Sequence, residues 1–207
     1  MKQSQLDGLR SYESLVRRYS RSLNLVSPAG LAAFPLKIDE ALRYAAPLET
    51  LLLERPRWLD VGSGAGLPAI PLAVAHPELP FILVERRKKR AGFLQLVKAQ
   101  LGLENVTVVA EDVARWQDSA KFAMVSAQAV GSFSLLYRLT RHLHPATVTM
   151  LSRKGPDWQA EAEQLQQQLG LSGARLGALK IQEYPLANRG RLVAVTVPGG
   201  LPCPSSG

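Results

Sequence analysis

A glycine-rich turn carries the clearest chemical signal in this sequence. The apolar stretch 58–61 reads as a strand, and Gly62, Gly64 and Gly66 follow it at alternate positions. Glycines in such a turn let the backbone approach a nucleotide-like ligand closely. The nicotinamide fingerprint G-x-G-x-x-G would need a glycine where Leu67 stands. The spacing therefore favours S-adenosylmethionine as the cofactor, although tight turns without any ligand also use glycine.

An acidic residue follows the next apolar run. Residues 81–84 (Phe-Ile-Leu-Val) predict a buried parallel strand that ends in Glu85. Ligands of open α/β sheets bind outside the carboxyl ends of the strands, so Glu85 is placed to accept hydrogen bonds from ribose hydroxyls. The alternative is a carboxylate that stabilises the start of the helix beginning near Arg86. The two roles are compatible.

Alternating strands and helices would position these residues. Helical patterns cover 68–75, a segment around Phe93 to Leu101, 132–143 and 157–169. Strand patterns cover 57–61, 81–84, 105–110, 122–127 and 146–152, with two further strands between Tyr184 and Val197. This order predicts an α/β fold, a Rossmann-like, doubly wound and mostly parallel sheet of seven strands with an antiparallel edge.

The flanking regions differ from this central part. Residues 1–56 predict an N-terminal helical extension, with an amphipathic helix from Leu6 to Tyr19, a break at 27–30 and a second helical segment over about 39–53. We expect residues 57–197 to form the cofactor-binding domain. Residues 198–207, rich in proline, glycine and serine, predict a flexible tail.

Composition narrows the class of protein. The 207 residues are 46% hydrophobic and 20% charged, which excludes general disorder. One cysteine, Cys203, and three histidines offer little for a disulfide, a catalytic thiol or a zinc site, so we expect no metal. No apolar run is long enough to cross a bilayer and the N-terminus does not resemble a secretory signal, so we expect a cytoplasmic protein without a membrane partner.

The net charge of +8 indicates a polyanionic partner, with nucleic acid as the first candidate. The densest basic run is 86–90, and further arginines gather in the N-terminal helix. A run of this kind is also compatible with a merely solvated helix face. The case for nucleic acid therefore depends on the excess over the whole chain.

Several motifs together resemble a known family. They are residues 59–73 with prolines at 68 and 71, Asn24-Leu25-Val26, residues 89–94, residues 101–106 and Lys154-Gly155. Over roughly residues 10–197 the chain resembles Class I S-adenosylmethionine-dependent methyltransferases, and more narrowly the ribosomal RNA small subunit methyltransferase G family, also called GidB. The double proline after the third glycine is more specific than the glycines alone.

The resemblance implies methylation of N7 of a guanine in 16S ribosomal RNA. Guanine N7 has an in-plane lone pair and no proton, so it can attack a sulfonium methyl group without a general base. We therefore expect no catalytic acid or base, and catalysis by positioning and electrostatics. The implied partner is small-subunit ribosomal RNA or its ribonucleoprotein, and we expect a monomer.

The motif positions and the resemblance together give two sets of candidate residues. The expected cofactor-binding set is Gly62, Gly64, Gly66, Leu67, Glu85, Asp112, Val113, Ala114 and Gln128. The expected RNA-binding set is Arg17, Arg18, Arg21, Arg87, Lys88, Arg153 and Lys154.

The sequence also departs from the family pattern. Ala114 stands where the family usually has glutamate, and Gln128 replaces the arginine of a Ser-Arg-Ala motif. A third difference lies at 36–40, where the family often has histidine before Leu-x-Asp-Ser. The departures leave open a working enzyme with a rebuilt adenine pocket, in which Glu111 or Asp112 replaces the missing carboxylate. They also leave open the same chemistry on another RNA or a small molecule, and a basic RNA-binding module without catalysis.

Overall fold

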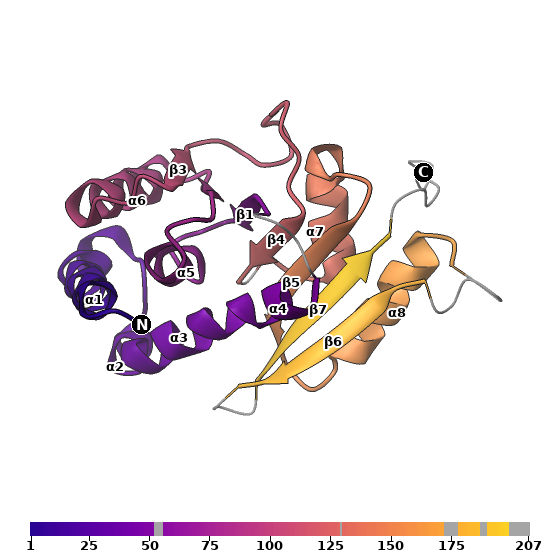
Figure 1. The fold of residues 1–207 in the computed structure, drawn as a ribbon, viewed down its shortest axis with the longest axis horizontal. Helices are drawn as coiled ribbons and strands as arrows, with labels where there is room; N and C mark the ends of the chain where they lie inside the picture. Colours follow the sequence, from indigo (N-terminus) through magenta and orange to yellow (C-terminus); the bar gives the residue numbers. More distant parts are fainter. Residues whose placement is uncertain (52–55, 129, 172–177, 187–189, 199–207) are drawn as a thin grey trace.

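The computed structural model describes residues 1–51, 56–128, 130–171, 178–186 and 190–198. Within them, seven strands form one sheet in the order β3-β2-β1-β4-β5-β7-β6 (Figure 1). Their bounds are β1 (Trp58–Val61), β2 (Phe81–Val84), β3 (Val106–Val109), β4 (Met124–Ala127), β5 (Val148–Lys154), β6 (Lys180–Pro185) and β7 (Arg191–Val197). The strands β1 to β5 pair in parallel, whereas β7 is antiparallel to β5 and to β6. The predicted sheet with its antiparallel edge is confirmed.

Helices cover both faces of the sheet. The side chains of β1 alternate between two hydrophobic clusters, with Trp58 on one face and Leu59 on the other. The Trp58 face packs against α5 (Ala69–Ala75) and α6 (Lys88–Leu101). The Leu59 face packs against α7 (Phe133–Thr140), the short 3₁₀ helix η2 (Arg141–Leu143) and α8 (Trp158–Gln168). This double covering explains the continuous apolar runs of the central strands.

The N-terminal helices complete the layer on the Trp58 face. They are α1 (Gln3–Leu23), α2 (Pro28–Ala32), α3 (Phe34–Leu42), the 3₁₀ helix η1 (Arg43–Ala45) and α4 (Ala46–Leu51). Tyr12, Phe34 and Tyr44 are fully buried in the same cluster as Trp58, and the rings of Tyr12 and Phe34 lie 5.6 Å apart. This region is therefore part of the core of the sheet, and a separate domain over residues 1–56 stays a prediction.

Some predicted boundaries shift. The expected break at 27–30 contains a helix start, because the Ser27 side chain accepts a hydrogen bond from the Gly30 N–H at 3.1 Å and caps α2. The second helical segment begins at Phe34 instead of 39, with Pro35 in its first turn, where proline is tolerated. Strand β5 extends to Lys154 because β7 pairs with it along that length. Residues 52–53 of the helical prediction and 199–207 of the predicted tail lie outside the described residues.

Gly66 is held in a position that no other residue fits well. Its φ of +102° lies in the left-handed region, and an added Cβ would lie 2.6 Å from Ile70 Cγ1. We expect Gly66→Ala to lower the free energy of unfolding by about 2–4 kcal/mol, measured by urea denaturation. Gly92→Ala in α6 is the control, because nothing lies within 4 Å of a Cβ at that position. Equal stability of the two variants would contradict this account of the turn.

Candidate functional site

A cavity with a volume of about 460 Å³ lies at the carboxyl ends of the central strands. It sits where the strand order reverses between β1 and β4, the position at which doubly wound sheets bind ligands. Its size suits a nucleotide-like molecule. The lining residues are Val61, Gly62, Val84, Glu85, Arg86, Arg87, Arg90, Glu111, Asp112, Val113, Gln128, Val130, Leu135 and Leu139.

The glycine turn forms one wall of this cavity. Gly62 has φ +67° and donates its N–H to the Val84 carbonyl at 2.8 Å, which ties the turn to β2. An added Cβ on Gly62 would lie 3.2 Å from Val130 Cγ2. Both the backbone conformation and the proximity of Val130 therefore favour glycine here. Val130 belongs to the wall that faces the turn.

Glu85 connects three segments around the cavity. Its carboxylate is 4% exposed. Oε2 accepts a hydrogen bond from the Gly64 N–H at 3.0 Å, and Oε1 accepts one from the Arg87 N–H at 2.8 Å. Arg87 precedes the first residue of α6, so the expected contact with a helix start is present. Each oxygen keeps a further acceptor position, so these contacts leave room for a ligand hydroxyl.

Asp60 is a buried acid that the sequence prediction did not include. Its exposed fraction is 1%, and burial raises the pKa of its carboxyl to about 7. Ser126 Oγ donates a hydrogen bond to Asp60 Oδ1 at 2.6 Å and accepts one from Trp58 Nε1 at 2.9 Å. The available signal was an acidic residue within an otherwise apolar strand directly before the glycines. Such perturbed acids concentrate at functional sites.

Helix α1 braces the glycine turn from the outside. The Tyr12 hydroxyl, fully buried, donates a hydrogen bond to the Ala65 carbonyl at 3.0 Å. At the other end of the helix, the Asn24 carbonyl accepts a hydrogen bond from Arg90, which lines the cavity. The sequence predicted an amphipathic helix here, and the structure shows that it packs against α5 and α6 and also contacts the glycine turn and the cavity rim.

The predicted cofactor residues divide into two groups. Gly62, Glu85, Asp112, Val113 and Gln128 line the cavity. The others are not among its lining residues; they are Gly64, Gly66, Leu67 and Ala114.

Acidic side chains lie at the mouth of the cavity, beside Ala114, one of the departures noted in the sequence. Ala114 is exposed, and its N–H donates to Asp112 Oδ1 at 3.0 Å. Glu111 and Asp112 are both exposed and line the cavity. Carboxylates are therefore present close to Ala114.

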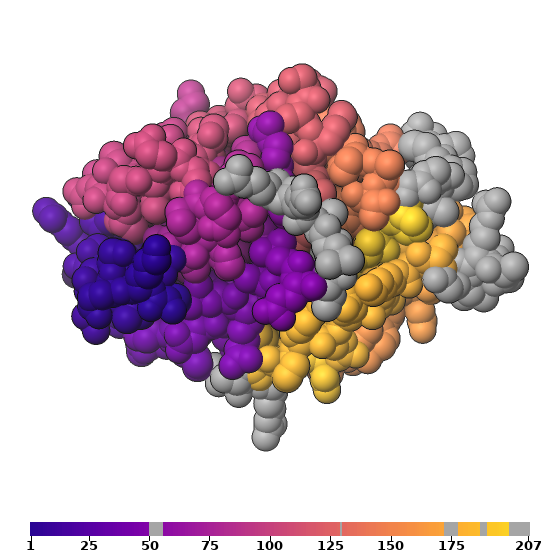
Figure 2. Space-filling model, viewed as in Figure 1, coloured from indigo at the N-terminus to yellow at the C-terminus, as the bar shows by residue number. Residues whose placement is uncertain are grey.

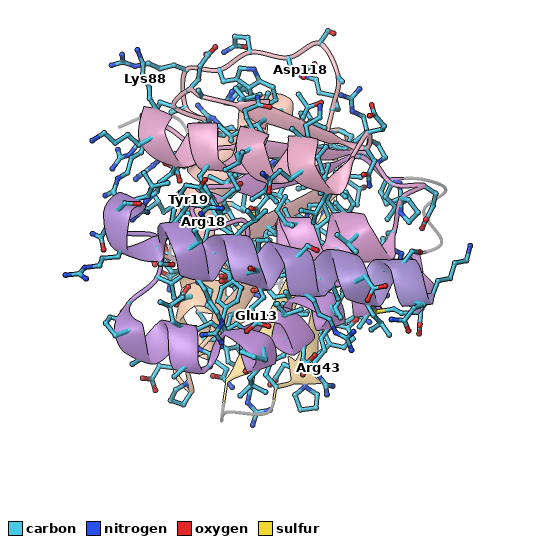
Figure 3. The ribbon with its side chains drawn as sticks, turned by 90° about the vertical axis from the view of Figure 1, so that its left-hand side faces the viewer. Glu13, Arg18, Tyr19, Arg43, Lys88 and Asp118 are labelled. Carbon is cyan, nitrogen blue, oxygen red and sulfur yellow. The ribbon has the colours of Figure 1, made fainter. Side chains whose placement is uncertain are left out.

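Five of the predicted RNA-binding residues gather at one end of two neighbouring helices. Figure 3 shows Arg18 near the end of α1 and Lys88 at the start of α6, on the same side of the molecule. We call the exposed residues of this surface the basic rim; they are Arg17, Arg18, Arg21, Arg87 and Lys88. Arg87 also lines the cavity, so the basic rim reaches its mouth. Arg17 pairs with Glu13 at 2.7 Å.

The other two predicted RNA ligands have internal partners. Arg153 and Lys154 are successive residues of β5, so their side chains point to opposite faces of the sheet. Arg153 Nε lies 3.3 Å from Glu40 Oε2 of α3, and the Arg153 side chain is 41% exposed. Lys154 is only 7% exposed and pairs with Glu161 of α8 at 2.6 Å. A direct contact between Lys154 and a phosphate is therefore not available in this structure, because its ammonium group lies inside.

Two features are absent from the described residues. No group of three or more histidine, cysteine, aspartate or glutamate side chains is arranged to hold a metal ion. No described helix has both the length and the apolar character required to span a membrane.

Comparisons with known proteins agree on one family. A family model described as rRNA small subunit methyltransferase G matches residues 5–185. The chain is similar to ribosomal RNA small subunit methyltransferase G of Helicobacter acinonychis, with 37% identity over 128 residues, 62% of this chain and 70% of that protein. The protein of the same name from Stutzerimonas stutzeri is 31% identical over 169 residues, 81% of this chain and 77% of that protein.

A likeness to solved structures concerns the fold alone. A SAM dependent methyltransferase from Aquifex aeolicus superimposes with a TM-score of 0.57 at 15% identity, and the match covers 86% of this chain and 97% of that one. A ribosomal protein L11 methylase from Lactobacillus delbrueckii gives a TM-score of 0.53 at 13% identity, over 80% of this chain and 78% of that one.

The raised pKa of Asp60 makes a prediction about stability and pH. The folded state favours the protonated carboxyl, so its stabilising effect is complete below pH about 4 and is lost as the pH rises through about 7. Asp60→Asn removes this titration. The unfolding free energy of the variant relative to the wild type should therefore increase between pH 4 and 7, by at most about 4 kcal/mol. Urea denaturation at several pH values measures the difference, and a constant offset would contradict the assignment.

Proposed function

The chain belongs to the rRNA small subunit methyltransferase G family, and from this premise we propose that it transfers the methyl group of S-adenosylmethionine to N7 of a guanine in 16S ribosomal RNA. The observation that carries the proposal is the cavity at the switch point of the sheet, lined by the glycine turn and by Glu85. We take the enzyme to act as a cytoplasmic monomer on the RNA or its ribonucleoprotein.

The residues around the cavity fit this cofactor. Gly62 would let the backbone approach it, and Glu85 would accept hydrogen bonds from the ribose hydroxyls, since both line the cavity. Val113, buried at the cavity wall, would pack against the adenine. Glu111 and Asp112 add acceptors at the mouth. When bound, S-adenosylmethionine supplies an electrophilic methyl group, and its sulfonium charge would be attracted by these carboxylates, in a cavity that Arg86, Arg87 and Arg90 also line.

The acceptor chemistry makes few demands on the protein. Guanine N7 carries a lone pair and no proton, so no residue has to remove a proton from it. The task of the site is to hold the base in line with the methyl group, and correct orientation alone can account for a large part of a rate enhancement. The polar and apolar wall opposite the glycine turn, with Gln128, Val130 and Leu135, is the part of the cavity available for that task.

The basic rim supports RNA as the substrate. Its five cations are exposed, and they adjoin the mouth of the cavity through Arg87. Phosphate contacts of this type give affinity without sequence selectivity and position the nucleic acid. The decisive test is mass mapping of modified nucleotides in ribosomal RNA from cells with and without the gene. The proposal requires one N7-methylguanine of 16S RNA to disappear with the gene, and an unchanged map would refute it.

The second candidate is an RNA-binding module without catalysis. The observation in its favour is Gln128 on the cavity wall, because an amide lacks the fixed positive charge and planar donor fork of the family's arginine. Calorimetry with S-adenosylmethionine separates the two. The enzyme must bind the cofactor, whereas the absence of binding at millimolar concentration would favour the module.

Glu85 gives the sharpest test of the cofactor assignment. Glu85→Ala removes a charged acceptor from the cavity and releases the Gly64 and Arg87 N–H groups. We expect a loss of about 1–3 kcal/mol in the binding free energy of S-adenosylmethionine, measured by calorimetry. The effect should exceed that of Glu104→Ala, an exposed residue just after α6. Equal affinities for the two variants would remove Glu85 from the site.

Lys88 tests the basic rim, because it is exposed but does not line the cavity. Lys88→Ala should weaken binding to a 16S RNA fragment and lower the slope of log affinity against log salt by about 1, the change for one lost phosphate contact. Affinity for S-adenosylmethionine should not change.

Lys180→Ala is the control for this prediction. Lys180 lies on β6, at the opposite edge of the sheet, so its loss removes the same charge and should leave RNA binding intact. Figure 2 shows how far β6 (yellow) lies from α6 (pink) on the surface. An unchanged salt slope for Lys88→Ala would argue against the rim.

A further inference from the structure

Lys154 is a buried lysine with a complete set of partners. Its Nζ donates hydrogen bonds to the Gly131 carbonyl at 2.7 Å and to Glu161 Oε2 at 2.6 Å. The same atom lies 4.6 Å from the centre of the Phe133 ring. Burial of an ammonium group is costly unless such contacts offset it. Three different contacts converge on one atom, which indicates that the position of the charge matters.

These contacts hold residues 131–133, which lead into α7. Gly131 has φ +105° and lies in this segment, and Phe133 is the first residue of α7. Gln128 and Val130, which precede these residues, and Leu135 of the helix supply one wall of the cavity. Lys154 itself is absent from the lining of the cavity. Any effect of Lys154 on the cavity is therefore indirect and passes through the Gly131 backbone, to which it is hydrogen-bonded.

This wall lies very close to the glycine turn. A Cβ on Gly62 would lie 3.2 Å from Val130 Cγ2, so the space between the two walls is narrow. A small movement of Gly131 would carry its neighbour Val130 with it and change that space. Misplacement of a substrate by about 1 Å can cost about a hundredfold in rate.

We propose that Lys154 is a positioning residue for methyl transfer, which fixes the β4–α7 wall of the cavity against the glycine turn so that the acceptor base lies in line with the methyl group. The inference rests on the proposed function. Glu161, whose side chain is 32% exposed, neutralises the buried ammonium. The contact that matters for the reaction is the one to the Gly131 carbonyl, and the ion pair with Glu161 serves mainly stability.

Two substitutions separate these contributions. Lys154→Met keeps a long side chain and removes both hydrogen bonds, whereas Glu161→Gln keeps an acceptor for Lys154 and leaves its bond to Gly131. We expect Lys154→Met to lower kcat on 16S RNA roughly tenfold or more at a temperature where the variant is folded. Glu161→Gln should stay within about threefold of the wild type, although both variants lower Tm. The control is Lys180→Met, an exposed lysine of β6, with unchanged kcat.

Hydrogen exchange provides a readout that does not depend on activity. In Lys154→Met, amide exchange should accelerate in residues 130–137 and remain as in the wild type over β1 and the glycine turn. The affinity for S-adenosylmethionine should change less than about threefold, since Gly62 and Glu85 stay in place.

Three results would overturn the proposal: an unchanged kcat in Lys154→Met, an equal loss of kcat in both variants, or uniform acceleration of exchange over the whole chain. If the wild type proves inactive on ribosomal RNA, the proposed function fails. The exchange measurement then still decides whether Lys154 holds the wall.

Discussion

The carboxylate of Glu85 holds the ligand-binding end of the sheet together. Its two oxygens accept hydrogen bonds from the Gly64 and Arg87 N–H groups, so one buried side chain joins the end of β2, the glycine turn and the start of α6. Gly62, Gly64 and Gly66 all have positive φ in the folded protein. Glycine loses more conformational entropy on folding than other residues, so the turn needs such an anchor to hold it in place. Tyr12 supports the same turn from α1 through the Ala65 carbonyl. The shape of the cavity thus depends on polar contacts to the backbone as well as on apolar packing.

The sequence predicted those parts of the fold in which local pattern and long-range packing agree. The apolar runs of β1 and β2 are buried on both faces, so their composition is strong evidence for parallel strands. The glycine turn could be found because positive φ restricts its positions to glycine. Glu85 could be found because an acidic residue at the end of an apolar strand stands out in the sequence. The start of α3 was missed because its first turn contains Pro35, which in sequence reads as a break but in structure begins a helix.

Side-chain roles that depend on register could not be predicted in the same way. Arg153 and Lys154 look alike in sequence, and both were expected to contact RNA. Their pairing with Leu192 and Arg191 of β7 extends β5, and the alternation of the strand then directs Arg153 toward Glu40 and Lys154 toward Glu161. Asp60 was missed for a related reason, although an acidic residue within an apolar strand was a visible signal. Its partner Ser126 is distant in sequence, and only the pairing of β1 with β4 brings the two together.

Charges of both signs line the cavity, whereas the basic rim consists of cations, and this difference relates the two ligands to each other. Glu85, Glu111 and Asp112 line the cavity together with Arg86, Arg87 and Arg90, and the other cations of the basic rim lie at the end of α1 and the start of α6. The sulfonium group of the cofactor would find carboxylates within the cavity, and the negative RNA would find cations at the cavity mouth and on the basic rim. Arg87 belongs to both regions, because it is part of the basic rim and also lines the cavity. Its backbone N–H donates a hydrogen bond to Glu85. The start of α6 is therefore the point at which the cavity and the basic rim meet, and the Glu85 carboxylate that anchors the glycine turn is also hydrogen-bonded to this point.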